Sequence, residues 1–288
     1  MTDTTSRNYP NIFESFKIVG ILILTMVVVV PVSMVLNNVV GKEISMFVYY
    51  VLSMGISFWI VDGRRRKWSG ESVYSFGISS VKIIALVSIA VLGIQTGIVS
   101  PIVSLIPMPE FVKKLFLELS GQTGIFSFMT IAIAAPILEE LIFRGIILDG
   151  LLKKYSPLKS ILVSSILFGI VHLNPWQFVT ALAIGSLSGW VYYKTRNLML
   201  CIVIHFVNNF AAFISMHFTD AEAMMNSELV DYYGGLMNLI LIISGALILT
   251  ACSLILLKGE FQKAEINFVS EQEEPIESDD SSVDENSI

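Results

Sequence analysis

The chain has 288 residues, of which 54% are hydrophobic and 15% are charged, and its mean hydropathy is +0.74. Soluble globular domains average about 45–50% apolar and about 25% charged residues, so this composition favours a membrane protein over a soluble domain. The net charge of −6 is concentrated at the C-terminus, because nine acidic residues and no basic residue follow Lys263.

Eight apolar segments follow one another along the chain, each close to the roughly 20 residues that cross a bilayer as a helix. The predicted spans are residues 18–36, 44–61, 83–106, 125–149, 157–173, 177–195, 198–218 and 235–257. The sequence therefore predicts an all-α, polytopic membrane protein with about eight transmembrane helices. The first span contains Pro31 and has no convincing small-residue cleavage site, so we do not expect a cleavable signal peptide.

The segment that joins the third and fourth spans has an amphipathic pattern. Phe111, Leu115 and Leu119 lie opposite Lys113 and Lys114 at helical spacing. This pattern predicts an interfacial helix that lies along the membrane surface.

Basic residues predict how the chain is oriented. With the N-terminus in the cytosol, fourteen bases fall in inside segments and three (Lys42, Lys113 and Lys114) in outside segments. This asymmetry is the positive-inside pattern of a multi-pass cell-membrane protein with both termini cytoplasmic. The basic run at residues 64–67 lies between two spans, so it indicates topology, and we expect no nucleic-acid partner.

Domain boundaries follow from these segments. We expect an N-terminal transmembrane region with the interfacial helix, then a polar-motif core, then an outer loop with the last span, and finally a disordered acidic tail. The corresponding ranges are 1–119, 120–218, 219–262 and 263–288.

The fourth span contains charged residues in the stretch PILEELIFRG, residues 136–145. An ionisable side chain inside a membrane span is costly unless it faces a partner or a water-filled cavity. Arg144 follows Glu140 by four residues, one helical turn away, which predicts a structural ion pair. Glu139 points about 100° away around the helix and is left for another role.

Two later spans contain the polar groups that could work with Glu139. His172 lies in the fifth span, and His205 in the seventh, followed one turn later by Asn209. A single histidine in a membrane helix also serves as an interhelical hydrogen-bonding residue. Taken together, however, these groups predict one polar cavity that opens toward the cytosol or the inner leaflet, with polar atoms of Glu139 and both histidines roughly 3–7 Å apart.

The three motifs resemble those of a known family. EELIFR (139–144), FGIVH (168–172) and HFVNN (205–209) are similar to the EExxxR, FxxxH and HxxxN/D motifs of the CAAX protease and bacteriocin-processing family, also called the Abi family, which is related to type II CAAX prenyl endopeptidases. They occur in the family's order on three separate spans. The resemblance covers roughly residues 120–218.

The resemblance implies intramembrane hydrolysis of peptide bonds. It implies that Glu139 is the general base on a water shared with His172, while His205 and Asn209 donate to the oxyanion. The family is also labelled a metalloprotease, and Glu139, His172 and His205 could bind zinc. No HExxH helix is present, and we favour the metal-free mechanism.

Other functional classes remain open at this point. A secondary transporter also buries charged residues, but usually has paired broken helices in two halves, whereas these motifs cluster in one half. A non-catalytic bacteriocin-immunity or signalling scaffold would need the fold but would not need the carboxylate of Glu139. The expected partners are the bilayer and a peptide or protein substrate near the cytoplasmic leaflet; prenylated C-termini, bacteriocin leaders and pheromone precursors all fit.

Overall fold

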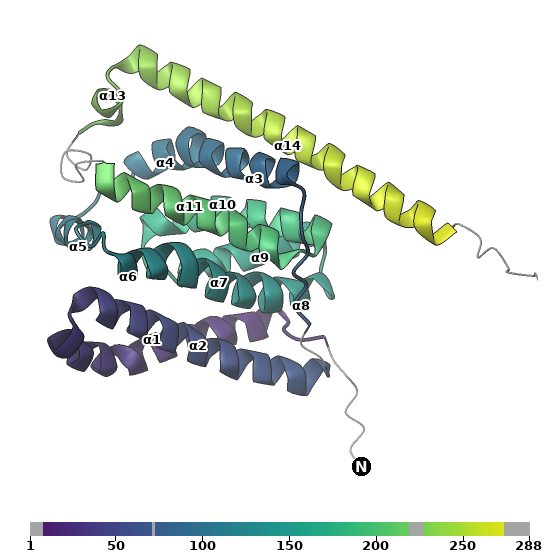
Figure 1. The fold of residues 1–288 in the computed structure, drawn as a ribbon, viewed down its shortest axis with the longest axis horizontal. Helices are drawn as coiled ribbons and strands as arrows, with labels where there is room; N and C mark the ends of the chain where they lie inside the picture. Colours follow the sequence, from purple (N-terminus) through teal and green to yellow (C-terminus); the bar gives the residue numbers. More distant parts are fainter. Residues whose placement is uncertain (1–7, 71–72, 219–226, 274–288) are drawn as a thin grey trace, which may run out of the picture.

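The computed structural model describes residues 8–70, 73–218 and 227–273. In this part of the chain all regular secondary structure is helical, and the long helices run side by side in a bundle (Figure 1). The all-α prediction is therefore confirmed.

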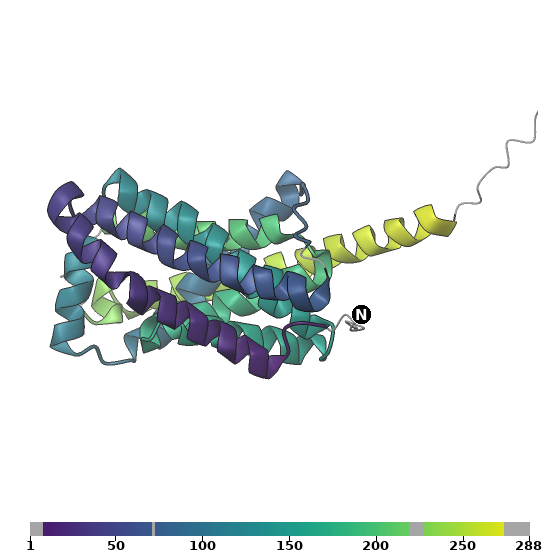
Figure 2. The same cartoon turned by 90° about the horizontal axis from the view of Figure 1, so that it is seen from below.

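The first two helices form an antiparallel hairpin that lies along one side of the bundle (Figures 1 and 2). α1 (Ile12–Val40) begins with a capping box, in which Asn11 and Glu14 each accept a hydrogen bond from the other's backbone N–H. Gly41 joins it to α2 (Lys42–Ser69) with φ +82°, a conformation that glycine adopts without strain. The hairpin brings α2 against the segment that contains Glu139 and Glu140.

The opposite side of the bundle is built from α3 (Val81–Ile94) and the long helix α14 (Leu236–Glu273). A five-residue π-helix, η1 (Gln95–Val99), and the short α4 (Ser100–Ser104) continue α3. A Cβ atom at Gly93 would lie 2.2 Å from Thr250 Oγ1, so the missing side chain allows the two helices to approach closely. Such small residues are typical of helix contacts within membranes.

The segment with the paired glutamates is helical from residue 125 to residue 152 but changes its winding. Its elements in order are α6 (Ile125–Phe128), the π-helix η2 (Met129–Ala134), α7 (Ala135–Glu140), the π-helix η3 (Leu141–Leu148) and α8 (Asp149–Leu152). Wide π-helical turns thus lie on both sides of α7. Such turns occur frequently at functional sites.

Three further helices complete the centre of the bundle. They are α9 (Pro157–Ile170), α10 (Pro175–Thr195) and α11 (Leu198–Phe218). The remaining described helices are α5 (Glu110–Ser120), which covers the segment predicted to be an interfacial helix, and the short α13 (Leu229–Tyr232); the interfacial location of α5 stays a prediction. An apolar core that includes Ile142, Phe143, Ile146 and Leu167 lies between the central helices and the α1–α2 hairpin.

Five of the described helices are long and apolar enough to cross a membrane. They are Ile12–Val40, Lys42–Ser69, Val81–Ser104, Leu198–Phe218 and Leu236–Ala264. The other three predicted spans, 125–149, 157–173 and 177–195, also fall largely on helical segments. The chain is a polytopic membrane protein, and the count of eight stays a prediction. α14 continues to Glu273, so the first part of the predicted tail is helical, and residues 274–288 lie outside the described residues.

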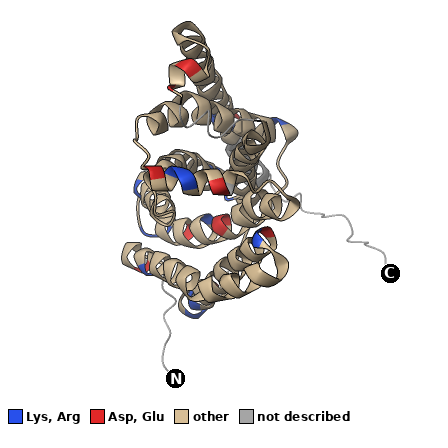
Figure 3. Cartoon of the chain, turned by 90° about the vertical axis from the view of Figure 1, so that its left-hand side faces the viewer, with Lys and Arg blue, Asp and Glu red and all other residues tan. Residues whose placement is uncertain are grey.

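Charged residues are sparse along the bundle and concentrate in particular places, as the end-on view in Figure 3 shows. At one end Asp149 binds three bases from segments that are far apart in the sequence: Arg65 (2.8 Å), Lys153 (2.8 Å) and Arg196 (3.2 Å). All three belong to segments predicted to face the cytosol. The structure therefore places these bases together at one end, while the membrane side of that end stays a prediction.

Candidate active site

Glu140 is the most fully bound polar group of the site. It lies at the end of α7 with 1% of its surface exposed. Its Oε1 accepts hydrogen bonds from Arg144 Nη1 (2.8 Å) and from His205 Nδ1 (3.0 Å), and its Oε2 accepts one from Ser188 Oγ (3.0 Å). Both oxygens of Glu140 thus accept hydrogen bonds from side chains of the protein.

Arg144 provides the charge that balances Glu140. The contact is the one that the four-residue spacing predicts, and both side chains are 1% exposed. The guanidinium also donates from Nη2 to the carbonyl oxygen of Gly185 (3.2 Å) and lies over the ring of Phe168, with Cζ 4.7 Å from the ring centroid. Buried charges persist only when paired and hydrogen-bonded in this way.

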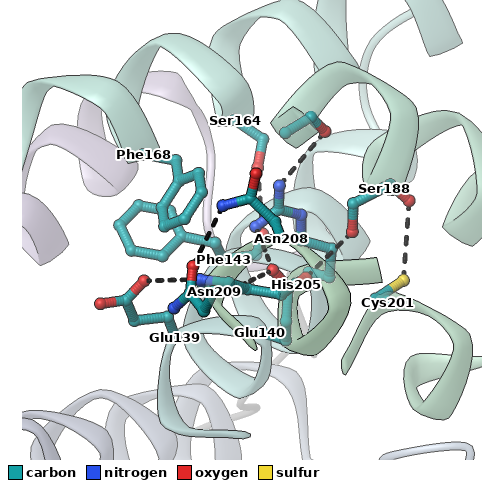
Figure 4. Close-up of polar contacts among 12 residues, drawn as sticks. Glu139, Glu140, Phe143, Ser164, Phe168, Ser188, Cys201, His205, Asn208 and Asn209 are labelled. Atoms are coloured by element: carbon teal, nitrogen blue, oxygen red, sulfur yellow. Dashed lines mark hydrogen bonds and ion pairs between the residues drawn. The ribbon is translucent and has the colours of Figure 1, made fainter. Parts of the chain in front are cut away.

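His205 lies between the two glutamates, as the close-up in Figure 4 shows. Its Nδ1 is 3.0 Å from Glu140 Oε1, and its Nε2 is 3.7 Å from Glu139 Oε2. Glu140 Oε1 also accepts a hydrogen bond from Arg144, so the carboxylate is the acceptor and Nδ1 carries the proton. The other ring nitrogen, Nε2, faces Glu139.

Glu139 differs from its neighbour although it is also buried, with 7% of its surface exposed. The hydroxyl of Tyr50, on α2, donates to Glu139 Oε1. Among the described residues, Glu139 Oε2 has no hydrogen-bond partner, although it is buried. The two adjacent carboxylates therefore differ: both oxygens of Glu140 accept hydrogen bonds within the protein, whereas only one oxygen of Glu139 does.

His172 lies just after α9 and is half-buried. Its Nδ1 is 2.8 Å from the backbone carbonyl oxygen of Phe168, which can only accept, so Nδ1 carries the proton and Nε2 has the lone pair in the neutral ring. The rings of His172 and His205 both pack edge-on against Phe168, with centroid distances of 5.1 and 5.5 Å. Phe168 thus lies in contact with both histidines.

Asn209 follows His205 by one turn on α11, as the sequence predicts. Its Nδ2 donates to the carbonyl oxygen of Ile131 (2.8 Å), and its Oδ1 accepts from Asn208 Nδ2 (3.1 Å). A carboxamide nitrogen has two hydrogens, so the contact with Ile131 leaves one of them. The predicted cavity that would join these groups to the cytosol stays a prediction.

The same geometry bears on the zinc site that Glu139, His172 and His205 could form. Over residues 8–70, 73–218 and 227–273, no three His, Cys, Asp or Glu side chains are grouped as ligands of one ion. The zinc set Glu139, His172 and His205 therefore does not fit a metal in this arrangement, and no step below passes through one.

Two members of the cluster were not identified from the sequence. Tyr50 lies in the second helix, 89 residues before Glu139, and Ser188 lies in α10, 48 residues after Glu140. Tyrosine and serine are common in membrane helices, and neither belongs to a motif of charged residues. Only the packing of helices reveals them.

The central part of the chain is similar to one known protein family. The family described as "Rce1-like: Type II CAAX prenyl endopeptidase Rce1-like" matches residues 121–211. This range includes Glu139, Glu140, His172, His205 and Asn209. Residues 121–211, about a third of the chain, are thus similar to the type II CAAX prenyl endopeptidases. Tyr50 and α2 lie outside the matched CAAX protease segment.

Two curated proteins are similar over parts of the chain. The "Putative membrane peptidase YdiL" of Bacillus subtilis (strain 168) is 36% identical over 78 residues, which cover 27% of this chain and 32% of that protein. The "Uncharacterized 24.3 kDa protein" of Escherichia coli is 30% identical over 106 residues, which cover 35% of this chain and 48% of that protein. The chain thus spans less than half the length of either relative. No solved structure matches it significantly.

Proposed function

We propose that the chain is an intramembrane endopeptidase in which Glu139 activates a water for attack on a peptide bond. The family match and the relative named as a membrane peptidase support a membrane protease in general. The observation that carries the specific proposal is the difference between the two glutamates. Glu140 is bound through both oxygens, whereas Glu139 has a buried Oε2 without a hydrogen-bond partner among the described residues.

The proposed reaction uses this open oxygen as the base. A water held by Glu139 Oε2, and shared with the lone pair on His172 Nε2, attacks the carbonyl carbon of the scissile bond. Glu139 takes a proton from the water as the new C–O bond forms, and the carbonyl oxygen becomes an oxyanion. The C–N bond then breaks as that proton passes from Glu139 to the leaving nitrogen, which restores the carboxylate.

Two groups on α11 stabilise the oxyanion in this proposal. The donors are the remaining N–H of Asn209 and the Nε2–H that His205 carries in its doubly protonated form, and these residues lie one helical turn apart. Glu140 accepts from Nδ1 and fixes the orientation of the ring, just as a carboxylate orients the histidine of a serine protease. Glu140 therefore acts through His205, and Arg144 acts through Glu140.

The proposed substrates are membrane-associated peptides, such as lipidated C-termini or leader peptides, reached from the cytoplasmic leaflet. A non-catalytic scaffold of the same fold would explain the Glu140–Arg144 pair. It would give no reason for a second carboxylate buried with one open oxygen, because an unsatisfied buried polar atom destabilises the fold.

The test is cleavage by the purified protein in detergent. A panel of prenylated and leader peptides is incubated with the wild type, with Glu139→Gln, and with the control Glu118→Gln, which changes an exposed carboxylate on α5. We expect Glu139→Gln to keep its folded yield and to lose cleavage about 10²- to 10⁴-fold, the usual contribution of a general base. Cleavage by Glu139→Gln at the wild-type rate would contradict the mechanism.

A further inference from the structure

Tyr50 contacts the proposed base from outside the segment that matches the family. It lies on α2, whereas the family match begins at residue 121. Its hydroxyl donates to Glu139 Oε1, and Oε2 has no hydrogen-bond partner among the described residues. One carboxylate oxygen is therefore restrained from α2, and the other remains open beside His205.

The ring of Tyr50 is held firmly enough to restrain a carboxylate. It packs against the apolar core that contains Ile142 and Phe143, so its position is tied to the segment that bears Glu139. Its backbone carbonyl accepts a hydrogen bond from Ser53 Oγ (3.1 Å) one turn later on α2. A tyrosine side chain has only two principal torsions, and this packing leaves little freedom for the hydroxyl.

The distance between Glu139 and His205 indicates that the hydrogen bond from Tyr50 prevents a direct contact between these two side chains. Glu139 Oε2 is 3.7 Å from His205 Nε2, which is longer than the 2.7–3.2 Å of an N–H···O hydrogen bond. Without the hold on Oε1, a small rotation would close this gap and give a direct pair between the two groups. That pair would occupy both the oxygen that holds the water and the nitrogen that receives the oxyanion.

We infer that Tyr50 is a positioning residue that keeps Glu139 and His205 apart, so that Glu139 Oε2 and His205 Nε2 both remain available to water and substrate. This inference rests on the proposed function, because the groups that Tyr50 positions are the proposed base and oxyanion donor. Tyr50 acts through Glu139 and contacts no reacting atom.

The experiment compares two conservative substitutions at adjacent residues of α2. Tyr50→Phe removes the hydroxyl that binds Glu139, and Tyr49→Phe removes a hydroxyl that donates to the backbone carbonyl of Met26 (3.2 Å). Both proteins are purified in detergent, their melting temperatures are recorded, and kcat and KM are measured separately on a peptide that the wild type cleaves in a Glu139-dependent manner.

We expect Tyr50→Phe to keep its fold and its KM while kcat falls roughly 10- to 100-fold, as expected for loss of a hydrogen bond to a charged group. Tyr49→Phe should keep both constants. An unchanged or raised kcat in Tyr50→Phe, an equal loss in Tyr49→Phe, or failure of Tyr50→Phe to fold would each overturn the inference. The proposed function fails separately, if cleavage by the wild type does not depend on Glu139.

Discussion

Glu139 and Glu140 are consecutive in the sequence, yet their carboxylates lie beside opposite nitrogens of one imidazole ring, that of His205. Successive residues of a helix point about 100° apart, so one side of the helix cannot hold both groups in the same contact. Here the ring lies between the two directions. Glu140 is enclosed by Arg144, Ser188 and His205, and Glu139 faces α2 and the open side of the ring.

Glu140→Gln tests whether the ion pair between Glu140 and Arg144 stabilises the fold. The substitution removes the charge that balances Arg144, and loss of one partner of a buried ion pair costs about 3–5 kcal/mol. We expect a lower folded yield and a lower melting temperature, measured by size-exclusion chromatography and thermal unfolding in detergent. A Glu140→Gln protein as stable as the wild type, alongside an unstable Glu139→Gln protein, would reverse the assignment of roles.

Ser188→Ala tests the hydrogen bond to the second oxygen of Glu140. The variant loses the donor at 3.0 Å and leaves Glu140 Oε2 unsatisfied, which should cost about 1–3 kcal/mol of unfolding free energy. Ser186→Ala is the matched control, because Ser186 lies two residues earlier on α10 and donates only to the backbone carbonyl of Leu182. We expect thermal unfolding in detergent to separate the two variants; equal melting temperatures would contradict the contact.

Gly185→Val tests how closely α10 approaches Arg144. A Cβ atom at Gly185 would lie 3.0 Å from Arg144 Nη2 and 3.4 Å from Phe168 Cδ1, so a larger side chain must displace the guanidinium or the ring. Overpacking of this kind costs about 1–3 kcal/mol, and we expect a lower melting temperature together with reduced cleavage. Gly245→Val on α14 is the control, because a Cβ atom there meets nothing within 4 Å.

The membrane orientation is tested by reporter fusions. The excess of bases in alternate loops predicts that both termini are cytoplasmic. A reporter attached after Ile288 should therefore be active only in the cytosol, and one placed in the loop that follows α11 should be active only outside. A C-terminal reporter that is active only on the outer face would show that the prediction is wrong.

The local part of the site could be predicted from the sequence, because helix geometry alone relates residues within one turn. The four-residue spacing of Glu140 and Arg144, and that of His205 and Asn209, specify which side chains share a helix face. The order of the apolar segments likewise predicts the helices. These inferences need no knowledge of how one helix packs against another.

The contacts between helices could not be predicted in detail. The sequence predicted that Glu139 lies near both His172 and His205, but not that one ring, that of His205, lies between Glu139 (3.7 Å) and Glu140 (3.0 Å). The π-helical turns on both sides of α7 change the direction of the following residues, and the spacing of the polar motifs does not predict them. Tyr50 and Ser188 are found only because α2 and α10 pack against this segment.

The short spacing between Glu140 and Arg144 has a consequence for how the protein is made. The two residues lie one turn apart on the same helix, so they enter the membrane together as the chain is synthesised from its N-terminus. His205, which is 65 residues from Glu140, and Ser188, which is 48 residues from it, belong to later helices. The pair with Arg144 therefore balances the charge of Glu140 within its own helix, without help from these later helices. If the arginine were moved to another helix, the nascent segment would enter the bilayer with Glu140 unbalanced in addition to Glu139.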